Sequence, residues 1–401
     1  MKIAMLTNNY RPFVGGVPIS VERQAQELIK LGHQVTVFAP MYESEEKEQA
    51  ESFREKILEE DKKAPERVVR YRSQKRKMDN GMVYPGIYPA EILAVFERER
   101  FDCIHVHHPM FVGPWALWLG RKYGIPVIYT YHTRYEDYLH YLPYFRINER
   151  STAVKKKIVE LAQNKVIPSY MRWFCNRCDL VLAPSAGMQQ MIRGYGVNTP
   201  IAIFPTGLDG SFFIRNVRRS KEIREQYGKG KRHLLVTVSR LEKEKNYGFL
   251  LRGIAELKQE IEDDFHLLII GDGSQKAELK VRASILGIQD EVTFAGNVPN
   301  DQVKDYLNAS DLFLFASKSE TQGIVLAEAM AAGTPVVAVH AIGADDIIED
   351  GVNGFLTEER EEEWAAKAAE ALKDNTNSRM KSAALISAEN YRSSRLAIYE
   401  E

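Results

Sequence analysis

The pattern most able to do chemistry is a pair of carboxylates, Glu320 and Glu328, on either side of Gly323. The apolar run Leu312–Phe315 predicts a strand before them, and the glycine can begin the helix that follows. N–H groups at a helix start bind anions, while the carboxylates can accept hydrogen bonds from sugar hydroxyls. The neighbours of Glu328 are apolar, which favours a buried, partnered acid over a solvated helix residue. We therefore predict a site for a phosphorylated sugar here, with Gln322 as part of it.

A second cluster is cationic. Arg240 and Lys245 follow the run His233–Val238, in the loop expected at the end of that strand. A guanidinium fork and an ammonium point charge together suit a pyrophosphate. Most basic loops are simply solvated, but an acid pair at the end of another strand makes phosphate binding the better interpretation. The chain has no Asp-x-Asp pair to hold a metal-bridged diphosphate. We therefore expect no metal and no cofactor, and assign charge neutralisation to these two cations.

Two glycine-rich turns also follow expected strands. Gly15 and Gly16 come after the run Lys2–Leu6, and Gly273 closes the turn Gly271-Asp272-Gly273 after a later apolar run. Such glycines let the backbone approach a ligand closely, although each signal alone is weak. A dinucleotide-binding dehydrogenase would need Gly-x-Gly-x-x-Gly after the first strand, and this sequence does not supply it. We expect both turns to lie near a donor nucleotide.

His132 stands at the end of the expected strand 126–130, within an aromatic segment that includes Tyr131, Tyr135 and Tyr138. A lone histidine is more often structural, but ligands of α/β proteins bind at the carboxyl ends of strands. The position of His132 there makes a functional role as good an interpretation as a structural one. The tyrosines suit an amphipathic or lipid acceptor, with packed helices of a globular domain as the alternative.

The other histidines and cysteines do not predict a metal site. His105, His107 and His108 share an expected strand, but no nearby carboxylates complete a ligand set, so we favour structural or substrate-facing roles. Cys175 and Cys178 form a CxxC motif without a second ligand pair. Because this pair closes an expected helix instead of opening one, we interpret it as two reduced thiols.

Bulk composition narrows the class of protein. A chain of 401 residues exceeds what one hydrophobic core usually supports, which predicts two domains. The net charge of −1 gives no global reason to expect a nucleic acid partner. There is no long uninterrupted apolar run, no secretory signal pattern at the start, and only three cysteines. These features predict a cytoplasmic protein that can sit peripherally at the inner face of the cell membrane.

Short apolar runs alternate with helical patterns along most of the chain, which predicts parallel sheets covered on both faces. We expect two doubly wound, Rossmann-like α/β domains that face a central cleft. The expected domains are 1–206 on the acceptor side and 207–375 on the nucleotide-sugar side, with a charged linker at 207–230. A terminal helix, 376–401, is expected to join the first domain.

Two segments are candidates for a membrane-facing surface. Residues 43–77 are dominated by charge and end in a basic run, which predicts either a solvated helix and loop or a cationic surface for anionic lipid headgroups. Residues 154–178 combine a lysine triplet with apolar and aromatic residues. Ordinary packed helices are the alternative there.

Together these features resemble family 4 of the retaining glycosyltransferases, which have the GT-B architecture. The resemblance covers nearly the whole chain, and the Arg-x4-Lys and Glu-x7-Glu spacings are specific in combination. The matching motifs are Gly15-Gly16, Leu31-Gly32-His33, Pro205-Thr206-Gly207-Leu208-Asp209, Arg240 with Lys245, Gly271-Asp272-Gly273, Gly296, and Glu320 with Glu328.

The resemblance implies a role for each site residue. The two cations would hold the donor diphosphate, assisted by backbone near Gly16. Glu320 would contact the donor sugar, Glu328 the ribose, and His132 would lie near the reacting sugar. Retention is thought to proceed by front-face attack, so no protein nucleophile is implied, and the enzyme contributes positioning and charge stabilisation.

Where many relatives carry an aromatic residue after the first acid, this chain has Thr321-Gln322. That departure and the aromatic segment 131–143 resemble the diacylglycerol glucosyltransferase subgroup. The leading hypothesis is transfer of glucose from a UDP-linked donor to 1,2-diacylglycerol at an anionic membrane surface. The alternatives are the same transfer to a soluble acceptor, or a non-catalytic nucleotide-sugar-binding protein.

Overall fold

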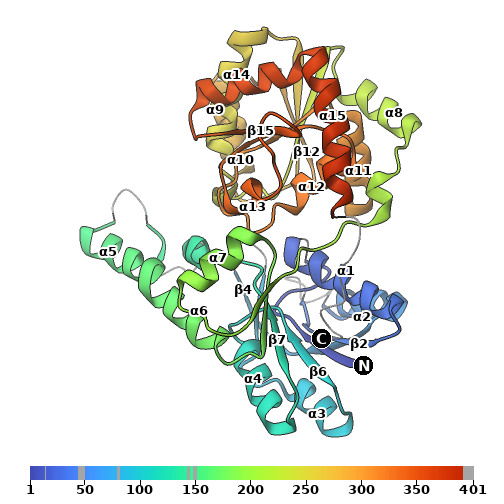
Figure 1. Ribbon diagram of the computed structural model, residues 1–401, viewed down its shortest axis with the longest axis vertical. Helices are drawn as coiled ribbons and strands as arrows, with labels where there is room; N and C mark the ends of the chain where they lie inside the picture. The colour runs from blue at the N-terminus through green and yellow to red at the C-terminus, as the bar shows by residue number, and fades with distance from the viewer. Residues whose placement is uncertain (14, 44–49, 79–81, 142–144, 148–150, 392–401) are drawn as a thin grey trace. The chain divides into compact units, whose positions relative to one another are not determined.

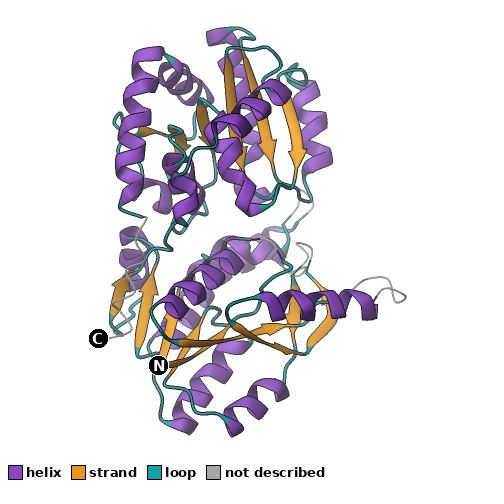
Figure 2. Cartoon of the chain, turned by 90° about the vertical axis from the view of Figure 1, so that its right-hand side faces the viewer, coloured by secondary structure: helices purple, strands orange, loops and turns teal. Residues whose placement is uncertain are grey.

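The computed structural model describes residues 1–13, 15–43, 50–78, 82–141, 145–147 and 151–391. The chain forms two compact units, and the boundary between them falls between Thr206 and Gly207 (Figure 1). Each unit is a parallel sheet with helices on both faces (Figure 2). Among the described residues, no helix is both long enough and apolar enough to cross a bilayer.

The first unit contains a seven-stranded sheet with the order β3-β2-β1-β6-β7-β8-β9, in which all neighbours are parallel. Its strands are β1 (Lys2–Leu6), β2 (Gln34–Pro40), β3 (Arg67–Tyr71), β6 (Cys103–Val106), β7 (Val127–Thr130), β8 (Leu180–Ala183) and β9 (Ile201–Ile203). A separate antiparallel pair is formed by β4 (Ser73–Lys77) and β5 (Val83–Pro85). Its helices are α1 (Gly16–Lys30), α2 (Ala50–Lys63), α3 (Ala90–Arg98), α4 (Val112–Tyr123), η2 (Tyr135–Tyr141), α5 (Ala153–Leu161), η4 (Ala162–Val166), α6 (Ile167–Cys175) and α7 (Ala186–Gly194).

Alternate residues of these strands pack against helices on opposite faces, as expected for a sheet buried on both sides. On one face Met5 lies in a buried cluster with Val21 and Leu28 of α1. On the other face the ring of Phe38 lies 5.7 Å from the ring of Phe96 in α3. The apolar runs of the sequence therefore form the strands because only a two-sided cover removes them from water.

The second unit repeats the scheme with a six-stranded sheet of order β12-β11-β10-β13-β14-β15. Its strands are β10 (His233–Val238), β11 (Phe265–Ile270), β12 (Val292–Gly296), β13 (Leu312–Phe315), β14 (Val336–Val339) and β15 (Gly354–Thr357). Its helices are η5 (Gly210–Phe213), α8 (Val217–Tyr227), η6 (Lys243–Lys245), α9 (Tyr247–Ile261), α10 (Lys276–Ile285), α11 (Asn300–Ala309), α12 (Ile324–Ala331), α13 (Ile342–Asp345), α14 (Glu361–Leu372) and α15 (Asp374–Glu389). Leu235 packs in the cluster that contains Trp364, whereas the next residue, Val236, packs in the cluster that contains Met330 on the other face. Each unit taken by itself confirms the prediction of a doubly wound α/β domain.

The strand orders place a topological switch point in each sheet. In the first unit β1 lies between β2 and β6, and in the second β10 lies between β11 and β13, so the chain winds in opposite directions from these central strands. Ligands of doubly wound sheets bind at the carboxyl ends of the strands around such a point. The loops after β1, β6 and β7 and those after β10, β11 and β13 are therefore the ones to examine for a site.

Residues 43–77 agree in part with the expected solvated helix and loop, because most side chains of α2 are exposed. After residues 44–49, which lie outside the described part, the chain forms α2 and then β3, which extends the sheet. The Arg70 side chain is only 3% exposed, and its Nε and Nη2 donate to Asp61 at 2.7 and 2.9 Å. The prediction of a cationic surface is therefore wrong for Arg70, because its charge is neutralised inside the fold. The side chains of residues 75–77 lie outside the described set.

The expected linker 207–230 is also structured. Leu208, Phe212 and Ile223 are between 0 and 4% exposed and belong to the core of the second unit. The few apolar residues of this charged stretch are spaced so that one side of η5 and α8 is buried. The linker prediction is therefore wrong beyond the unit boundary itself.

The expected return of residues 376–401 to the first domain differs from what the described part shows. Up to Tyr391 this segment packs on the second unit, where Met380, Ala384 and Ala388 of α15 are fully buried. Their four-residue spacing forms one narrow stripe of a helix, and small alanines let α15 approach α12 closely. Residues 392–401 lie outside the described residues.

Candidate active site

The centre of the candidate site in the second unit is an ion pair between Lys245 and Glu320. Lys245 ends η6 in the loop after β10, and Glu320 lies in the loop after β13. Because these strands are neighbours in the sheet, their loops meet at one edge, and the two side chains are only 14% and 16% exposed. The hydroxyl of Ser317 also donates to Glu320 Oε1 at 3.2 Å. The structure thus joins two residues predicted separately and adds Ser317, whose role has no sequence signal.

The start of α12 is built around Gly323. This glycine is the N-cap residue, with a φ of 70° in the left-handed region, and a Cβ there would lie 2.8 Å from Leu326 Cδ1. Glycine is therefore required to turn the chain into the helix. Glu328 is 5% exposed and Gln322 7% exposed. The interpretation of Glu328 as a buried acid is confirmed, and the solvated alternative is excluded.

Gly343 supports this loop in a way that the sequence did not predict. Its N–H donates to the carbonyl of Glu320 at 3.1 Å, and a Cβ at this position would lie 2.6 Å from the carbonyl carbon of Gln322. The start of α13 therefore packs backbone to backbone against the loop after β13. Only tertiary structure brings this glycine to the loop, so no local motif reveals it.

The loops after β10 and β11 are in direct backbone contact. A Cβ on Gly273 would lie 2.5 Å from the carbonyl oxygen of Leu241, and the Leu241 N–H donates to the carbonyl of Asp272 at 3.0 Å. Buried Glu242 accepts hydrogen bonds from Ser274, one from its N–H at 3.1 Å and one from its hydroxyl at 2.6 Å. Gly273 is therefore required by protein packing, and its predicted nearness to a nucleotide stays a prediction.

Arg240 belongs to the same edge of the second sheet. It follows β10, and its Nη2 lies 3.0 Å from Glu244 Oε1, a carboxylate whose side chain is 3% exposed. The Arg240 side chain itself is 28% exposed, so solvent and ligands can reach it. Both predicted phosphate-binding cations thus lie after β10, and each is held by an acid.

In the first unit, His132 is part of a group of contacting histidines. Its Nε2 lies 2.9 Å from Nδ1 of His107, and the His105 and His107 ring centroids are 4.1 Å apart. Burial lowers the pKa of His105, His108 and His132 to about 3, and it lowers the pKa of His107 well below its usual value. The second cause for His105, His107 and His108 is the repulsion of neighbouring histidines. The group is therefore uncharged at neutral pH.

The hydrogen bonds of these histidines fix the tautomer of His108. His108 Nδ1 accepts a hydrogen bond from the Asn8 N–H at 3.1 Å, so the proton of this ring must be on Nε2. His105 Nε2 contacts the hydroxyl of Thr130 at 2.6 Å. These contacts join the loop after β1 to the ends of β6 and β7. The histidines predicted as structural or substrate-facing are thus structural at His105 and His108.

The predicted acceptor-side tyrosines differ in their surroundings. Tyr131 is fully buried, and its ring lies 5.7 Å from the ring of Tyr129, so it packs as a core residue. Tyr135 and Tyr138 lie in η2 and are half-buried, with the Tyr138 ring stacked 5.8 Å from Tyr141. The hydroxyl of Tyr135 is buried, so of these three tyrosines Tyr138 is the one that the structure leaves accessible to an acceptor.

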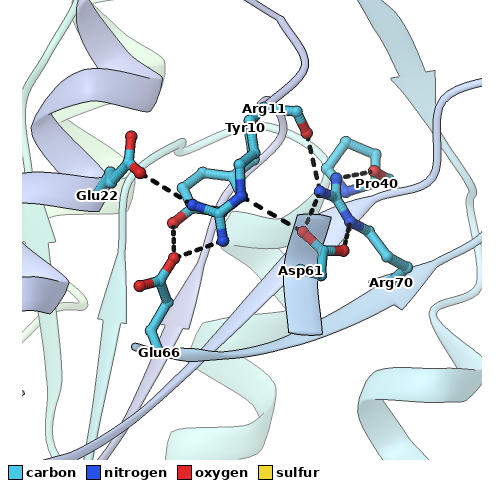
Figure 3. A network of polar contacts seen from close by, with 7 residues as sticks. All are labelled: Tyr10, Arg11, Glu22, Pro40, Asp61, Glu66 and Arg70. Atoms are coloured by element: carbon cyan, nitrogen blue, oxygen red, sulfur yellow. Dashed lines mark hydrogen bonds and ion pairs between the residues drawn. The ribbon is translucent and has the colours of Figure 1, made fainter. Parts of the chain in front are cut away.

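The glycine loop after β1 is held by a partly buried network of charges (Figure 3). Arg11 Nη1 donates to Glu22 of α1 at 2.9 Å, and its Nη2 donates to Glu66 at 2.6 Å. Glu66 also accepts a hydrogen bond from the Tyr10 hydroxyl at 2.6 Å. Arg70 of β3 donates to the Arg11 carbonyl at 2.8 Å. Side chains of α1, of β3 and of the turn before β3 thus fix the chain just before Gly15 and Gly16.

The two predicted glycines begin α1. Gly15 is its N-cap residue, and its carbonyl accepts a hydrogen bond from the Ile19 N–H at 3.3 Å. A Cβ on Gly16 would meet no atom within 4 Å, so protein packing does not require glycine there. That open space is what a close ligand contact would need, and the role of Gly16 at the donor stays a prediction.

Comparisons with known proteins identify the family of this chain. Residues 14–212 match the family described as Glycosyltransferase Family 4, and residues 219–386 match Glycosyl transferases group 1. The chain is similar to the alpha-monoglucosyldiacylglycerol synthase of Streptococcus pneumoniae, with 31% identity over 363 residues, which are 89% of this chain and 75% of that protein. The enzyme of the same name from Acholeplasma laidlawii is 26% identical over 366 residues, 90% of this chain and 86% of the relative.

The fold matches solved structures over the full length of the chain. An Anabaena protein, HepE, solved in complex with UDP, aligns with a TM-score of 0.74 and 20% identity, covering 100% of this chain and 99% of that one. Sucrose-phosphate synthase from Thermosynechococcus elongatus aligns with a TM-score of 0.73 and 17% identity, covering 97% and 94%. With two matched family descriptions and a relative above 30% identity, this chain belongs to glycosyltransferase family 4 and has the GT-B fold.

Proposed function

We propose that this protein transfers glucose from UDP-glucose to 1,2-diacylglycerol and retains the anomeric configuration. The observation that carries the transfer is the Lys245–Glu320 ion pair beside the N-terminus of α12, at the switch point of the second sheet. The acceptor follows the S. pneumoniae and A. laidlawii relatives, whose names state that they make monoglucosyldiacylglycerol. The donor nucleotide follows HepE, which was solved with UDP and with UDP-glucose.

In this proposal the bound donor takes the place of the ion pairs that Lys245 and Arg240 form with protein carboxylates. The diphosphate takes the ammonium of Lys245 and the guanidinium of Arg240, each of which is held by an acid in the structure. Glu320 is then available to accept hydrogen bonds from sugar hydroxyls, and Glu328 binds the ribose. Gln322 and the backbone at Gly15, Gly16, Gly273 and Gly323 complete the donor contacts. Two cations can neutralise a diphosphate without a metal ion.

The transfer step needs no protein nucleophile. The acceptor hydroxyl oxygen bonds to the anomeric carbon as the bond from that carbon to the phosphate oxygen breaks. The hydroxyl proton passes to the departing phosphate on the same face, which preserves the configuration. Uncharged His132 faces the reacting sugar as a hydrogen-bonding group. The contribution of the protein is positioning and electrostatic stabilisation of the leaving diphosphate.

Transfer assays with several nucleotide sugars, with and without diacylglycerol in anionic vesicles, test this function. Vesicle-dependent transfer from UDP-glucose, with the product anomer assigned by NMR, is the expected result. Donor turnover that is indifferent to diacylglycerol would redirect the enzyme to soluble acceptors. Nucleotide-sugar binding without any turnover would favour the non-catalytic alternative.

A further inference from the structure

One long helical segment of the first unit has an outer face that no described residue covers. The elements α5, η4 and α6 run end to end from Ala153 to Cys175 (Figure 1). Val159, Ile167 and Met171 are at most 6% exposed and attach the segment to the unit. Its first part, α5, has Val159 as its single buried residue. Most of the α5 surface therefore faces solvent.

Three apolar side chains form a row on that outer face. Val154, Ile158 and Leu161, which we call the α5 stripe, are 69, 54 and 51% exposed. Their spacing of four and three residues places them on one side of a helix, away from Val159. Single exposed apolar residues are common on proteins, but a row of three along one helix is a mark of an interaction surface.

The charge of the same segment indicates what covers the stripe. Residues 153–175 contain five basic residues and one acid, Glu160, whereas the whole chain has a net charge of −1. Lys156 and Lys157 are exposed, and Lys157 is three residues after Val154 and four before Leu161. Apolar residues beside lysines on one helix are typical of elements that lie in the interface of an anionic bilayer. A protein partner would need a matching acidic and apolar groove.

The segment is also tied to the proposed acceptor side of the enzyme. Gln163, in the π-helical turn η4, donates a hydrogen bond from Nε2 to the carbonyl of Glu136 at 3.1 Å. Glu136 lies in η2 between Tyr135 and Tyr138, and its carboxylate accepts a hydrogen bond from the Tyr195 hydroxyl at 2.7 Å. A lipid surface that contacts α5 would therefore lie one element away from the proposed acceptor residues.

We propose that the α5 stripe and the two lysines that flank it on the helix, Lys155 and Lys157, dock this protein on an anionic phospholipid surface. The stripe enters the acyl-chain boundary, and the lysines contact the phosphate headgroups. This inference deepens the proposed function and rests on it for the link to diacylglycerol. The docking itself can be measured independently of any sugar transfer.

The test uses the full chain and vesicles of phosphatidylcholine, with or without phosphatidylglycerol, in a sedimentation assay. We expect binding only to the anionic vesicles, with a loss of at least about tenfold in the variant Val154→Ser/Ile158→Ser/Leu161→Ser. Replacing Lys155 and Lys157 by glutamine should weaken binding by about fivefold per lysine. The matched control, Ile87→Ser/Trp118→Ser, removes residues of the same unit that are 83% and 44% exposed, and it should bind as the wild type does.

Two results would overturn the docking surface. One is wild-type vesicle binding by the stripe variant, and the other is an equal loss in the control, which would move the contact to another face. Transfer to a short-chain diacylglycerol dissolved below its aggregation concentration separates docking from chemistry. The stripe variant should retain that transfer while it loses transfer on vesicles. If the wild type binds vesicles through the stripe but transfers to neither acceptor, the proposed acceptor is wrong and the docking surface stands.

Discussion

At the residue scale, the Lys245–Glu320 pair links stability to donor binding. Each charge satisfies the other where both side chains are largely removed from solvent. Removal of one partner takes the opposite charge away from the other, which costs more stability than removal of both. Because the proposed donor uses the two residues separately, stability and donor affinity should respond differently to single and double substitutions.

The first prediction tests Glu320. In Glu320→Gln the amide oxygen can still accept from Lys245, so the loss of unfolding free energy should stay within about 2 kcal/mol. The anionic contact to the sugar is lost, and kcat should fall by about a hundredfold. Steady-state kinetics and thermal denaturation check both parts. A variant with near-normal kcat would remove Glu320 from the site.

The second prediction compares Lys245→Ala with Lys245→Ala/Glu320→Gln. The single variant should be destabilised because Glu320 keeps a poorly solvated negative charge, and the double variant should recover part of that stability. The affinity for UDP should be reduced in both by about tenfold or more, because the second substitution does not restore the cation. Calorimetric titration with UDP measures this. Recovery of UDP affinity in the double variant would place the diphosphate elsewhere.

At the scale of elements, the turn into α12 determines where its N–H groups point. Gly323 holds a left-handed conformation, and Gly343 packs on the same loop. A change in this turn would tilt the start of the helix together with Gln322. Substitutions in the turn that leads into α12 are therefore expected to disturb the site.

The third prediction concerns Gly323→Ala. The strained φ and the contact with Leu326 should cost about 1–3 kcal/mol of stability and raise the KM for the donor. Gly287→Ala is the control, because Gly287 has a similar φ of 68° but open space around a Cβ. It should show the backbone strain alone, with an unchanged KM. Equal KM values for the two variants would show that the α12 turn does not bind the donor.

The sequence predicts those elements whose signal is local. Apolar runs such as Lys2–Leu6 and Leu312–Phe315 mark strands because both faces of each sheet are covered. β3 has no such signal, because Arg67 and Arg70 interrupt the apolar pattern, and their partners Glu99 and Asp61 belong to other elements or loops of the unit. The packing of α15 also lacks a local signal, because it depends on a narrow stripe of mostly small residues that contact the second unit.

The candidate site shows the same division. Glu320, Lys245 and Gly323 could be predicted because loop position and residue type together suggest phosphate and sugar binding. Ser317 and Gly343 could not, because a serine and a glycine have no distinctive pattern until the fold brings them to Glu320. Contacts made across the sheet edge are a property of the tertiary structure.

At the scale of the whole molecule, the buried histidines connect folding to pH. His105 and His108 have folded-state pKa values of about 3, because burial disfavours their charged forms. In the unfolded chain they would take up protons near pH 6.5. Between these values the unfolded state binds more protons, so stability is fully present above about pH 6.5 and is lost as the pH falls toward 3.

The fourth prediction follows from this loss of stability at low pH. Each such histidine should lower the unfolding free energy by about 1.4 kcal/mol per pH unit below pH 6.5. His105→Gln should reduce the slope of stability against pH by one such contribution, measured by urea denaturation between pH 5 and 7. An unchanged slope in His105→Gln would mean that His105 is protonated in the folded state.

The arginines of β3, which interrupt its apolar pattern, also affect how copies of this protein behave in concentrated solution. β3 is an outer strand of its sheet, and outer strands can pair with strands of other molecules and start aggregates. Arg67, half exposed and bonded to Glu99, places an ion pair along that open strand. The opposite outer strand, β9, has only three residues. Both outer strands of this sheet are thus poor templates for a neighbouring chain, which disfavours edge-to-edge association through the first unit.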